Sequence, residues 1–309
     1  MNKIIILIFG CTSLFLHATE NISGKNNNYK NNAFVDNCIS ANDEADLLNS
    51  SVQYKIGSYY YLGVNGCSKD YEKAYDYFIQ SANQNNSNAQ LMISTFYLEG
   101  IVVKADNGMA IEWLVKSANQ NNTLAEYNLG MLYLEGKDIK KDSKEAYKWL
   151  FKAANKNDKS AQYNLSLMYR YGDGVEIDQK KSIEWLRKAA ELGHMIAMYD
   201  LATLYLIGDG LGKNINNAKY WYIKSAQLGS SESAFSLGML FFSEKKYEDA
   251  LQNLIYATDL GNKDAMYNLA LMYENGIGVK ADNKKSLYWY TKAAEKGSNE
   301  AIQKLKEFH

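Results

Sequence analysis

Residues able to do chemistry are sparse in this chain of 309 residues. It holds three histidines, of which His17 lies near the start and His309 ends the sequence, so no histidine metal cluster can be assembled. His194 follows a predicted turn at Gly193 and is expected to be a solvent-facing turn residue. There is no CxxC pair and no phosphate-binding loop. We therefore expect no metal and no cofactor, and we nominate no catalytic residue.

One short motif matches an enzyme signature. Ser243-Glu244-Lys245-Lys246 has the S-x-x-K spacing in which a serine nucleophile lies near a lysine, as in β-lactamases and penicillin-binding proteins. The S-D-N and K-T-G companions of that signature are absent from the sequence. Because serine and lysine are abundant here, about two such matches arise by chance. The motif is a weak indication of a nucleophilic mechanism.

The charge of the chain disfavours nucleic acid as a ligand. Lysine and arginine number 34 and aspartate and glutamate 35, so the formal net charge is −1 at pH 7. Arginine occurs only at Arg170 and Arg187, and lysine is spread along the chain. Phosphate binding requires a concentrated basic face, which this pattern does not provide.

An internal repeat must position all of these residues. The scheme A-x-Y-x-L-G-x-L-Y-x-x-G, a linker and A-x-x-W-L-x-x-A-A recurs mostly every 36 residues, which is typical of a solenoid of helix pairs. A chain without proline shows no obvious domain boundary within the array. We predict seven repeats, numbered 1 to 7 in chain order: 52-88, 89-124, 125-160, 161-196, 197-232, 233-264 and 265-300. Repeat 6 is shorter because its linker is reduced to SEKKYED.

The first helix of each repeat is indicated by its apolar period. In repeat 3, Tyr127, Leu129, Leu132 and Tyr133 follow a helical and not an alternating pattern. A small residue after the leucine, such as Gly130, allows a neighbouring helix backbone to approach closely. The helix is expected to end at a glycine, because glycine enters the left-handed region freely. These glycines are Gly63, Gly100, Gly136, Gly172, Gly208 and Gly276.

The second helix is marked by tryptophan. All five tryptophans occupy one position of the repeat: Trp113, Trp149, Trp185, Trp221 and Trp289. Aspartates such as Asp142, Asp178 and Asp282 precede this helix and are expected to cap a turn or a helix start. The helix stops at a residue that is always asparagine or glycine, the two types that most readily adopt left-handed geometry. The stops are Asn85, Asn121, Asn157, Gly193, Gly229, Gly261 and Gly297.

These residues carry a family resemblance. The segments AQYNLSLMYRYGDGVEIDQKKSIEWLRKAAELGHM and YENGIGVKADNKKSLYWYTKAAEKG resemble the Sel1-like repeat, a relative of the tetratricopeptide repeat. The resemblance covers about four-fifths of the chain. It implies an all-α fold, a right-handed α-solenoid of helix-turn-helix Sel1-like repeats. It also implies a protein–protein interaction scaffold whose partner, another protein or an extended peptide, binds in a concave groove.

By similarity to tetratricopeptide repeats, repeat positions 3, 7 and 10 of the first helix should line that groove. They are spaced i, i+4 and i+7 and so share one helix face. Position 3 is aromatic in nearly every copy, which is also what a core position looks like. Phe235 to Phe242 is the strongest candidate patch, because it coincides with the shortened repeat. This groove row consists of Tyr127, Met131, Leu134, Tyr163, Leu167, Arg170, Tyr199, Thr203, Leu206, Phe235, Met239 and Phe242.

A second function stays open at this point. The chain is similar to the cysteine-rich Sel1-like proteins of Helicobacter, a resemblance that implies weak penicillin binding and hydrolysis, or cell-wall binding. The repeated cysteine pairs of that subgroup are missing here. If the protein is an enzyme, a β-lactam hydrolase is the expected activity. The sequence leaves the partner and the oligomeric state open.

The ends of the chain are expected to differ from the repeats. Residues 1–18 read as a signal peptide, with Lys3, an apolar run from Ile4 to Leu16 and a small residue at Ala18, which predicts a periplasmic or secreted protein without an integral membrane span. The alternative is a lipoprotein signal that ends before Cys11 and leaves a lipid-anchored envelope protein. Residues 19-41 read as a flexible polar leader, 42-51 as an N-terminal capping helix and 301-309 as a C-terminal cap.

Cysteine use fits an exported protein. Signal cleavage near Ala18 leaves two cysteines, Cys38 and Cys67, in an oxidising compartment. A disulfide between them would close a loop of roughly 30 residues and contribute about 3–4 kcal/mol. Two free thiols are the alternative.

Overall fold

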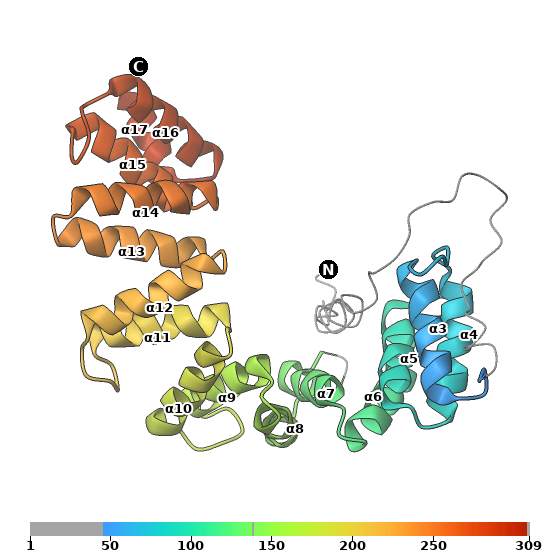
Figure 1. Ribbon diagram of the computed structural model, residues 1–309. Helices are drawn as coiled ribbons and strands as arrows, with labels where there is room; N and C mark the ends of the chain where they lie inside the picture. The colour runs from blue at the N-terminus through green and yellow to red at the C-terminus, as the bar shows by residue number, and fades with distance from the viewer. Residues whose placement is uncertain (1–45, 138, 308–309) are drawn as a thin grey trace, which may run out of the picture. The chain divides into compact units, whose positions relative to one another are not determined.

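The computed structural model describes residues 46–137 and 139–307. Within these residues the chain forms fifteen α-helices and no strand (Figure 1). The helices are α3 (Ser50–Leu62), α4 (Tyr71–Asn83), α5 (Ser87–Glu99), α6 (Asn107–Asn119), α7 (Thr123–Glu135), α8 (Ser143–Asn155), α9 (Lys159–Tyr171), α10 (Gln179–Glu191), α11 (Met195–Ile207), α12 (Ile215–Gln227), α13 (Ser231–Ser243), α14 (Tyr247–Asp259), α15 (Lys263–Asn275), α16 (Asn283–Glu295) and α17 (Asn299–Glu307).

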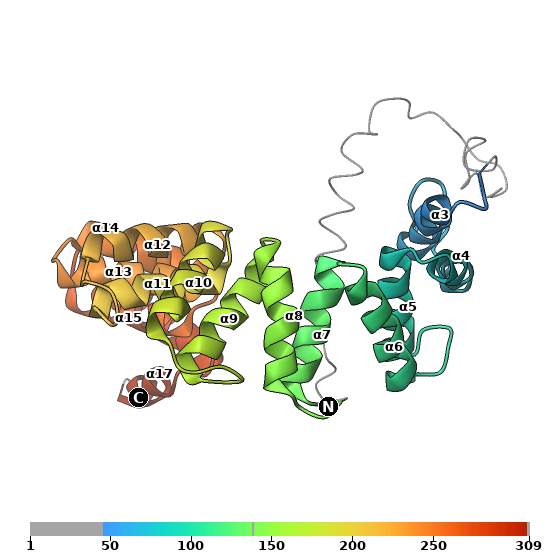
Figure 2. The ribbon, with the colours of Figure 1, turned by 90° about the horizontal axis from the view of Figure 1, so that it is seen from below.

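The chain divides into two compact units, Met1–Asp158 and Lys159–His309. Unit one contains α3 to α8 and unit two contains α9 to α17. Within each unit, consecutive helices pack against one another, and the two helices of one repeat share the larger contact. Figure 2 shows such a pair, α7 and α8, side by side. The predicted all-α solenoid of helix pairs is confirmed.

The residues between repeats adopt the left-handed geometry that the sequence predicts. Asn85 has φ of 63° and Gly193 has φ of 81°, and all seven predicted stops have positive φ. The backbone N–H of Asn85 donates to the carbonyl of Ala82, which satisfies a carbonyl of the helix end. Asparagine serves in the first three repeats and glycine in the other four.

The two helices of a repeat are joined by one backbone hydrogen bond across their linker. In repeat 4 the N–H of Asp178 donates to the carbonyl of Tyr169 at 2.9 Å, and in the shortened repeat 6 the N–H of Lys246 donates to Phe241 at 2.9 Å. Asp178 also caps α10 by accepting from the N–H of Lys181, and this backbone hydrogen bond is the main reason why the pKa of its carboxyl lies below the ordinary value. The predicted caps at Asp142 and Asp282 form in the same way.

The small residues of the first helices allow close helix packing. A Cβ added to Gly130 of α7 would lie 2.7 Å from Leu150 Cγ of α8, and one added to Gly238 of α13 would lie 3.0 Å from Leu254 Cγ of α14. These distances are shorter than a carbon–carbon contact allows. The sequence-based prediction that no large side chain fits here is confirmed.

The two ends of the described region differ. Residues 46–49 form a turn that leads into α3, whose N-cap is Asn49, so the predicted capping helix over 42-51 is wrong for this part of its range. The Asn49 side chain accepts from the N–H of Ser51 and thereby caps the first repeat directly. At the other end α17 packs on α16, where the closing helix was predicted. Residues 42–45, the predicted signal and leader, Cys11 and Cys38 lie outside the described residues.

In the described part of the chain, none of the helices combines the length and the apolar character that crossing a membrane requires.

Candidate functional site

The groove row lies on the first helices α7, α9, α11 and α13. Its position 3 contributes to the core: the Tyr127 ring is buried, and the half-buried rings of Tyr163, Tyr199 and Phe235 pack against hydrophobic clusters of unit two. A ring that packs against the core stabilises the repeat and leaves little of its surface for contact with a partner. The core role of position 3, one of the two readings of its aromatic residues, therefore has structural support.

Positions 7 and 10 are more open. Their apolar side chains are half-buried and Arg170 is exposed. A half-buried apolar side chain keeps part of its area in contact with water, and covering that area stabilises a complex. The half-buried members are Met131, Leu134, Leu167, Thr203, Leu206, Met239 and Phe242.

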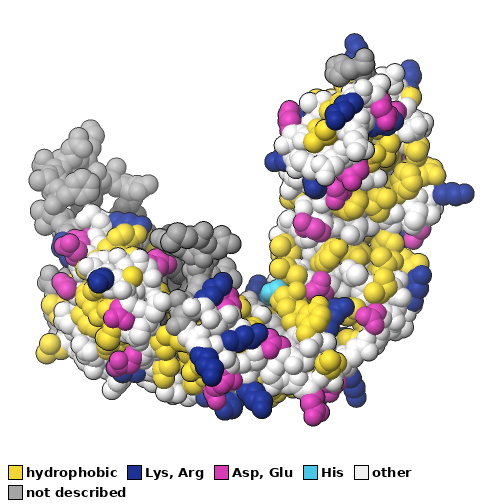
Figure 3. All heavy atoms as spheres, turned by 180° about the vertical axis from the view of Figure 1, so that it is seen from behind, with side chains coloured by type: hydrophobic (Ala, Val, Ile, Leu, Met, Phe, Trp, Pro, Cys, Tyr) yellow, Lys and Arg dark blue, Asp and Glu magenta, His cyan; other side chains and the backbone are white. Residues whose placement is uncertain are grey.

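The surface of unit two also carries apolar patches (Figure 3). Exposed aromatic and aliphatic side chains occur on its second helices, where Tyr220 of α12 and Tyr288 of α16 are 52% and 53% exposed. These side chains lie outside the groove row. Both directly precede the tryptophan of their helix, a position that holds Glu112, Lys148 and Glu184 in other repeats, so no repeated apolar pattern marked them in the sequence.

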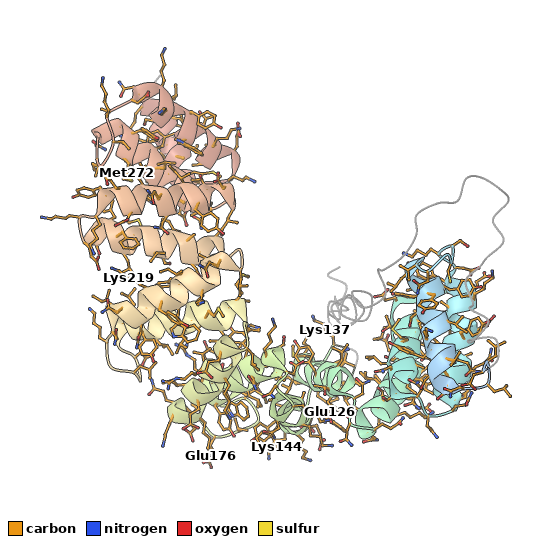
Figure 4. All side chains as sticks on the ribbon, in the orientation of Figure 1. Glu126, Lys137, Lys144, Glu176, Lys219 and Met272 are labelled. Atoms are coloured by element: carbon orange, nitrogen blue, oxygen red, sulfur yellow. The ribbon has the colours of Figure 1, made fainter. Side chains whose placement is uncertain are left out.

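In repeat 6, the side chains of the candidate patch pack partly against the core of the protein itself. Phe235, Met239 and Phe242 pack against the cluster that contains Leu254, and the Phe242 ring meets the Tyr247 ring edge-on at 5.4 Å. The three residues 244–246 replace the usual linker, and Lys219 of α12, labelled in Figure 4, donates to Glu244 at 2.6 Å. Hydrogen bonds from two lysines lower the pKa of the Glu244 carboxyl, and the bond from Lys219 has a larger effect than the bond from Lys246.

A polar cluster joins repeats 4 and 5 within unit two. The Tyr163 hydroxyl of α9 donates to Asp200 Oδ2 of α11 at 3.0 Å, and its ring stacks on His194 with 4.6 Å between ring centroids. Burial is the main reason why the pKa values of Tyr163 and Asp200 are both raised. Asp200 is a site candidate that the sequence analysis missed, since no motif marks it.

His194 is not the solvent-facing turn residue that the sequence suggested. It is half-buried and forms the N-cap of α11, where its Nδ1 accepts from the N–H of Ala197 at 3.1 Å. Burial, followed by the nearby Lys159 ammonium, lowers the pKa of His194 to about 4. The imidazole is therefore neutral at pH 7, as an N-cap acceptor must be.

The S-x-x-K motif does not form a nucleophile–base pair. The Ser243 hydroxyl donates to the carbonyl of Leu240 at 2.7 Å, and Lys246 Nζ lies 3.0 Å from Glu244 Oε2. Each of the two side chains is thus bound to a different group, and neither is bonded to the other. This arrangement gives no support to a serine acyl-transfer mechanism.

A surface hollow of about 620 Å³ lies beside α10. Its lining contains no serine, cysteine or histidine, so it offers no nucleophile of these types. Among the described residues, no group of three histidine, cysteine, aspartate or glutamate side chains could hold a metal ion. The lining residues are Gln179, Lys180, Ile183, Glu184, Arg187, Lys188, Glu191, Gly210 and Leu211.

A buried polar ladder in unit one also escaped the sequence analysis. Position 2 of repeats 1 to 3 carries a buried polar side chain that bonds to the residue just after its own second helix: Gln84 donates to Gln53 at 2.8 Å, and Gln120 donates to Gln90 at 2.7 Å. In repeat 3 the fully buried Glu126 is paired with Lys156 at 2.8 Å, and Figure 4 labels Glu126 on α7. The repetition of glutamine at position 2 was the available signal.

Cys67 is buried in the hydrophobic cluster of the first two repeats. Its predicted pairing with Cys38 stays a prediction, because Cys38 lies outside the described residues.

Known proteins agree with this architecture. The family model described as Sel1 repeat matches six segments: residues 50–86, 87–122, 123–158, 159–194, 196–230 and 263–298. The residues between the last two segments form α13 and α14, the helix pair of the shortened repeat.

Two solved structures share the fold. A protective antigen of uropathogenic Escherichia coli with an SLR fold is 30% identical, with a TM-score of 0.73, over 85% of this chain and 57% of its own. A Sel1 repeat protein from Oxalobacter formigenes is 31% identical, with a TM-score of 0.66, over 78% of this chain and 99% of its own.

Among curated proteins, an ERAD-associated E3 ubiquitin-protein ligase component from Arabidopsis thaliana is 34% identical over 73 residues. This stretch is 23% of the chain and only 11% of that relative. The plant protein therefore supports the repeat and says nothing further about this chain. The helix pairs, the six matched segments and the Oxalobacter structure agree, and the chain belongs to the Sel1 repeat family.

Proposed function

We propose that this protein is a binding scaffold that holds a segment of another protein along its groove row. Proteins built from Sel1 repeats are generally scaffolds for protein interactions. The observation that carries the proposal is that each of α9, α11 and α13 in unit two carries a half-buried apolar side chain at position 7 or position 10. Such side chains lose more water-exposed area on binding than a core residue can.

The groove row can be tested with substitutions that spare the core. Phe235 and Met239 both pack against a core cluster, so a charge at either would unfold the repeat. The double variant Met131→Lys/Leu167→Glu instead changes position 7 in repeats 3 and 4, where both side chains are half-buried. Its matched control is Ile255→Lys/Tyr288→Glu, which places charges of both signs on the exposed faces of α14 and α16.

The measurement is affinity capture from intact cells after chemical cross-linking, followed by calorimetric titration of the captured partner with purified protein. We expect the groove-row variant to lose the partner and the control variant to retain it, with both remaining helical by circular dichroism. Equal capture by both variants would remove the groove row from the proposal. Loss by the control alone would place the partner on the second helices.

We also propose export to the periplasm or beyond, from the signal-like residues 1–18. The mass and N-terminal sequence of the protein purified from cells test this proposal. Cleavage near Ala18 supports ordinary export, a lipidated Cys11 supports an envelope anchor, and an intact Met1 contradicts both.

The disulfide has its own test. Thiol titration of the exported protein in denaturant without reductant should find no free thiol if Cys38 and Cys67 are paired. Two thiols per chain would exclude the bond.

A further inference from the structure

Repeat 5 differs from every other repeat in the charge at position 4. Asp200 occupies this position on α11, whereas the equivalents carry no carboxylate. They are Lys55, Met92, Asn128, Asn164, Ser236 and Asn268. Asp200 lies three residues before Thr203 of the groove row and so shares a helix face with it, which places a negative charge beside the row at position 4 of this repeat only.

The carboxylate of Asp200 has one neutral partner and no ion pair. Tyr163 donates to its Oδ2 at 3.0 Å, and no lysine, arginine or histidine nitrogen among the described residues pairs with it. Arg170 on α9 lies near enough to act on it electrostatically, but the guanidinium is 3.9 Å from Asp209 Oδ2. His194 at the start of α11 is neutral.

A half-buried carboxylate without a cation costs stability. Removing it from water disfavours the charged form, and only a nearby positive charge or several hydrogen-bond donors compensate for that cost. Burial raises the pKa of Asp200, and the hydrogen bond from the Tyr163 hydroxyl and the charge of Arg170 offset only part of that effect. Groups that are kept in a costly environment on an accessible surface are typical of binding sites.

We propose that Asp200 and the hydroxyl of Tyr163 receive a lysine or arginine side chain of the partner segment. The proposal rests on the proposed function, because the same segment lies along the groove row. The cation would pair with Asp200, and its long apolar stem would cover Leu167, which is four residues after Tyr163 on the same helix face. The partner segment is thus basic at one position and apolar beside it.

The probe is a phage-displayed library of random twelve-residue peptides, selected on the full mature chain at low salt. Enriched peptides are then synthesised together with copies in which the basic residue is replaced by glutamine. Binding is measured to the native protein, to Asp200→Asn and to Asp259→Asn. The amide oxygen introduced by Asp200→Asn can still accept from Tyr163, and Asp259 is an exposed carboxylate on α14 that controls for the change in net charge.

We expect enriched peptides with a lysine or arginine at a fixed distance from an apolar residue. Asp200→Asn should weaken their binding about tenfold or more, which corresponds to losing one charge-assisted hydrogen bond. Asp259→Asn should leave the affinity within about twofold of the native value. The glutamine copies of the peptides should bind the native protein and Asp200→Asn equally.

Two results would overturn the inference in different ways. Selection of apolar peptides without a basic residue, or equal binding by Asp200→Asn, would leave the groove row standing and remove the cation site. Selection of no peptide at all would contradict binding of an extended segment by the groove row, and the cation site would fall with it.

Discussion

At the residue scale, His194 is the N-cap of α11, the first helix of repeat 5, a position that is occupied in other repeats by residues that do not titrate at neutral pH. The N-caps of α5, α7 and α15 are Asn86, Asn122 and Asn262, and that of α13 is Ser230. Each accepts a backbone N–H with an oxygen, whatever the pH. The imidazole accepts only while Nδ1 is unprotonated, so this one cap makes repeat 5 sensitive to acid.

The protein should lose stability between pH 6.5 and pH 4 through His194. The folded state lowers the pKa of His194 to about 4 from an ordinary 6.5, so the unfolded chain binds the proton first and the stabilisation present above pH 6.5 is lost as the pH falls. Linkage predicts a loss of about 2 kcal/mol between pH 7.5 and pH 5. Urea unfolding at the two pH values measures it.

His194→Asn is the matched control for this prediction. Asparagine keeps the cap without titrating near neutral pH, so the loss between pH 7.5 and pH 5 should be smaller in the variant by about that amount. The same pH dependence in both proteins would show that the imidazole is not held neutral by the fold.

At the element scale, the closeness of the two helices in a repeat depends on a missing side chain. Gly130 costs about 1 kcal/mol in helix propensity relative to alanine. The Leu150 side chain fills the space that a Cβ at this position would occupy. The helices of repeat 3 therefore gain contact that a more helix-favouring residue would prevent.

Gly130→Ala should destabilise the protein although alanine favours helices. Overpacking against Leu150 costs about 1–3 kcal/mol, which exceeds the gain in propensity. Gly108→Ala on α6 is the control, because its added Cβ meets only Asp106 Oδ1, at 3.3 Å, and should be neutral or stabilising. Thermal unfolding of the two variants compares them. A Gly130→Ala protein at least as stable as Gly108→Ala would contradict the packing argument.

In the polar ladder of unit one, the ion pair between Glu126 and Lys156 should be replaceable by a pair of glutamine amides. Lys156→Ala leaves the fully buried Glu126 without its cation and should cost about 3 kcal/mol. Glu126→Gln/Lys156→Gln rebuilds the glutamine pair that repeats 1 and 2 already contain, and should lie within about 1 kcal/mol of the native protein. Denaturant unfolding measures all three proteins. If the double variant is as unstable as Lys156→Ala, the ladder positions are not equivalent.

Most of this fold could be predicted from the sequence, because its determinants are local. A residue such as Asn85 or Gly193 fixes its own backbone, and Gly130 reports that a neighbour lies close, so spacing alone gave the helix pairs. The start of the first helix differed, since residues 46–49 form a turn and the Asn49 side chain caps a helix that begins at Ser50.

The candidate site could be predicted only in part. The groove row was predicted from the resemblance to tetratricopeptide repeats, whereas the contact between Tyr163 and Asp200 joins residues 37 apart on different helices. His194 was misjudged for the same reason, since the Tyr163 ring that stacks on it lies on α9, two helices before the helix that His194 caps. Pairwise contacts between repeats leave no mark within a single repeat.

At the scale of the whole molecule, each repeat relies on its neighbours, and the last one relies on α17. Ala301 is buried and Leu305 packs against the cluster that contains Tyr290. Lys304 lies 3.3 Å from Glu274, which also accepts from the Tyr290 hydroxyl. The closing helix thus covers the end of the apolar stack and neutralises a carboxylate of repeat 7.

Deleting residues 299–309 should loosen repeat 7 and spare distant repeats. In a one-dimensional array, stability is the sum of each repeat and its neighbouring contacts, so the loss is local. Hydrogen exchange followed by mass spectrometry should show faster exchange in α15 and α16 and unchanged exchange in α9 and α10. Equal acceleration throughout unit two would mean that this unit unfolds as one cooperative block.

The hydrogen bond across each linker makes the linkers replaceable. Asp70 N–H donates to Tyr60 across a linker one residue longer than most, and Lys246 N–H donates to Phe241 across a much shorter one, with nearly the same bond length of 2.9 Å. The hydrogen bond between the helix ends is thus kept whatever the length of the linker between them. An epitope tag, a fluorophore-bearing cysteine or a short reporter peptide inserted after Gly212, where an added Cβ would meet nothing within 4 Å, would leave the hydrogen bond between the helices in place and give the protein an attachment point for imaging.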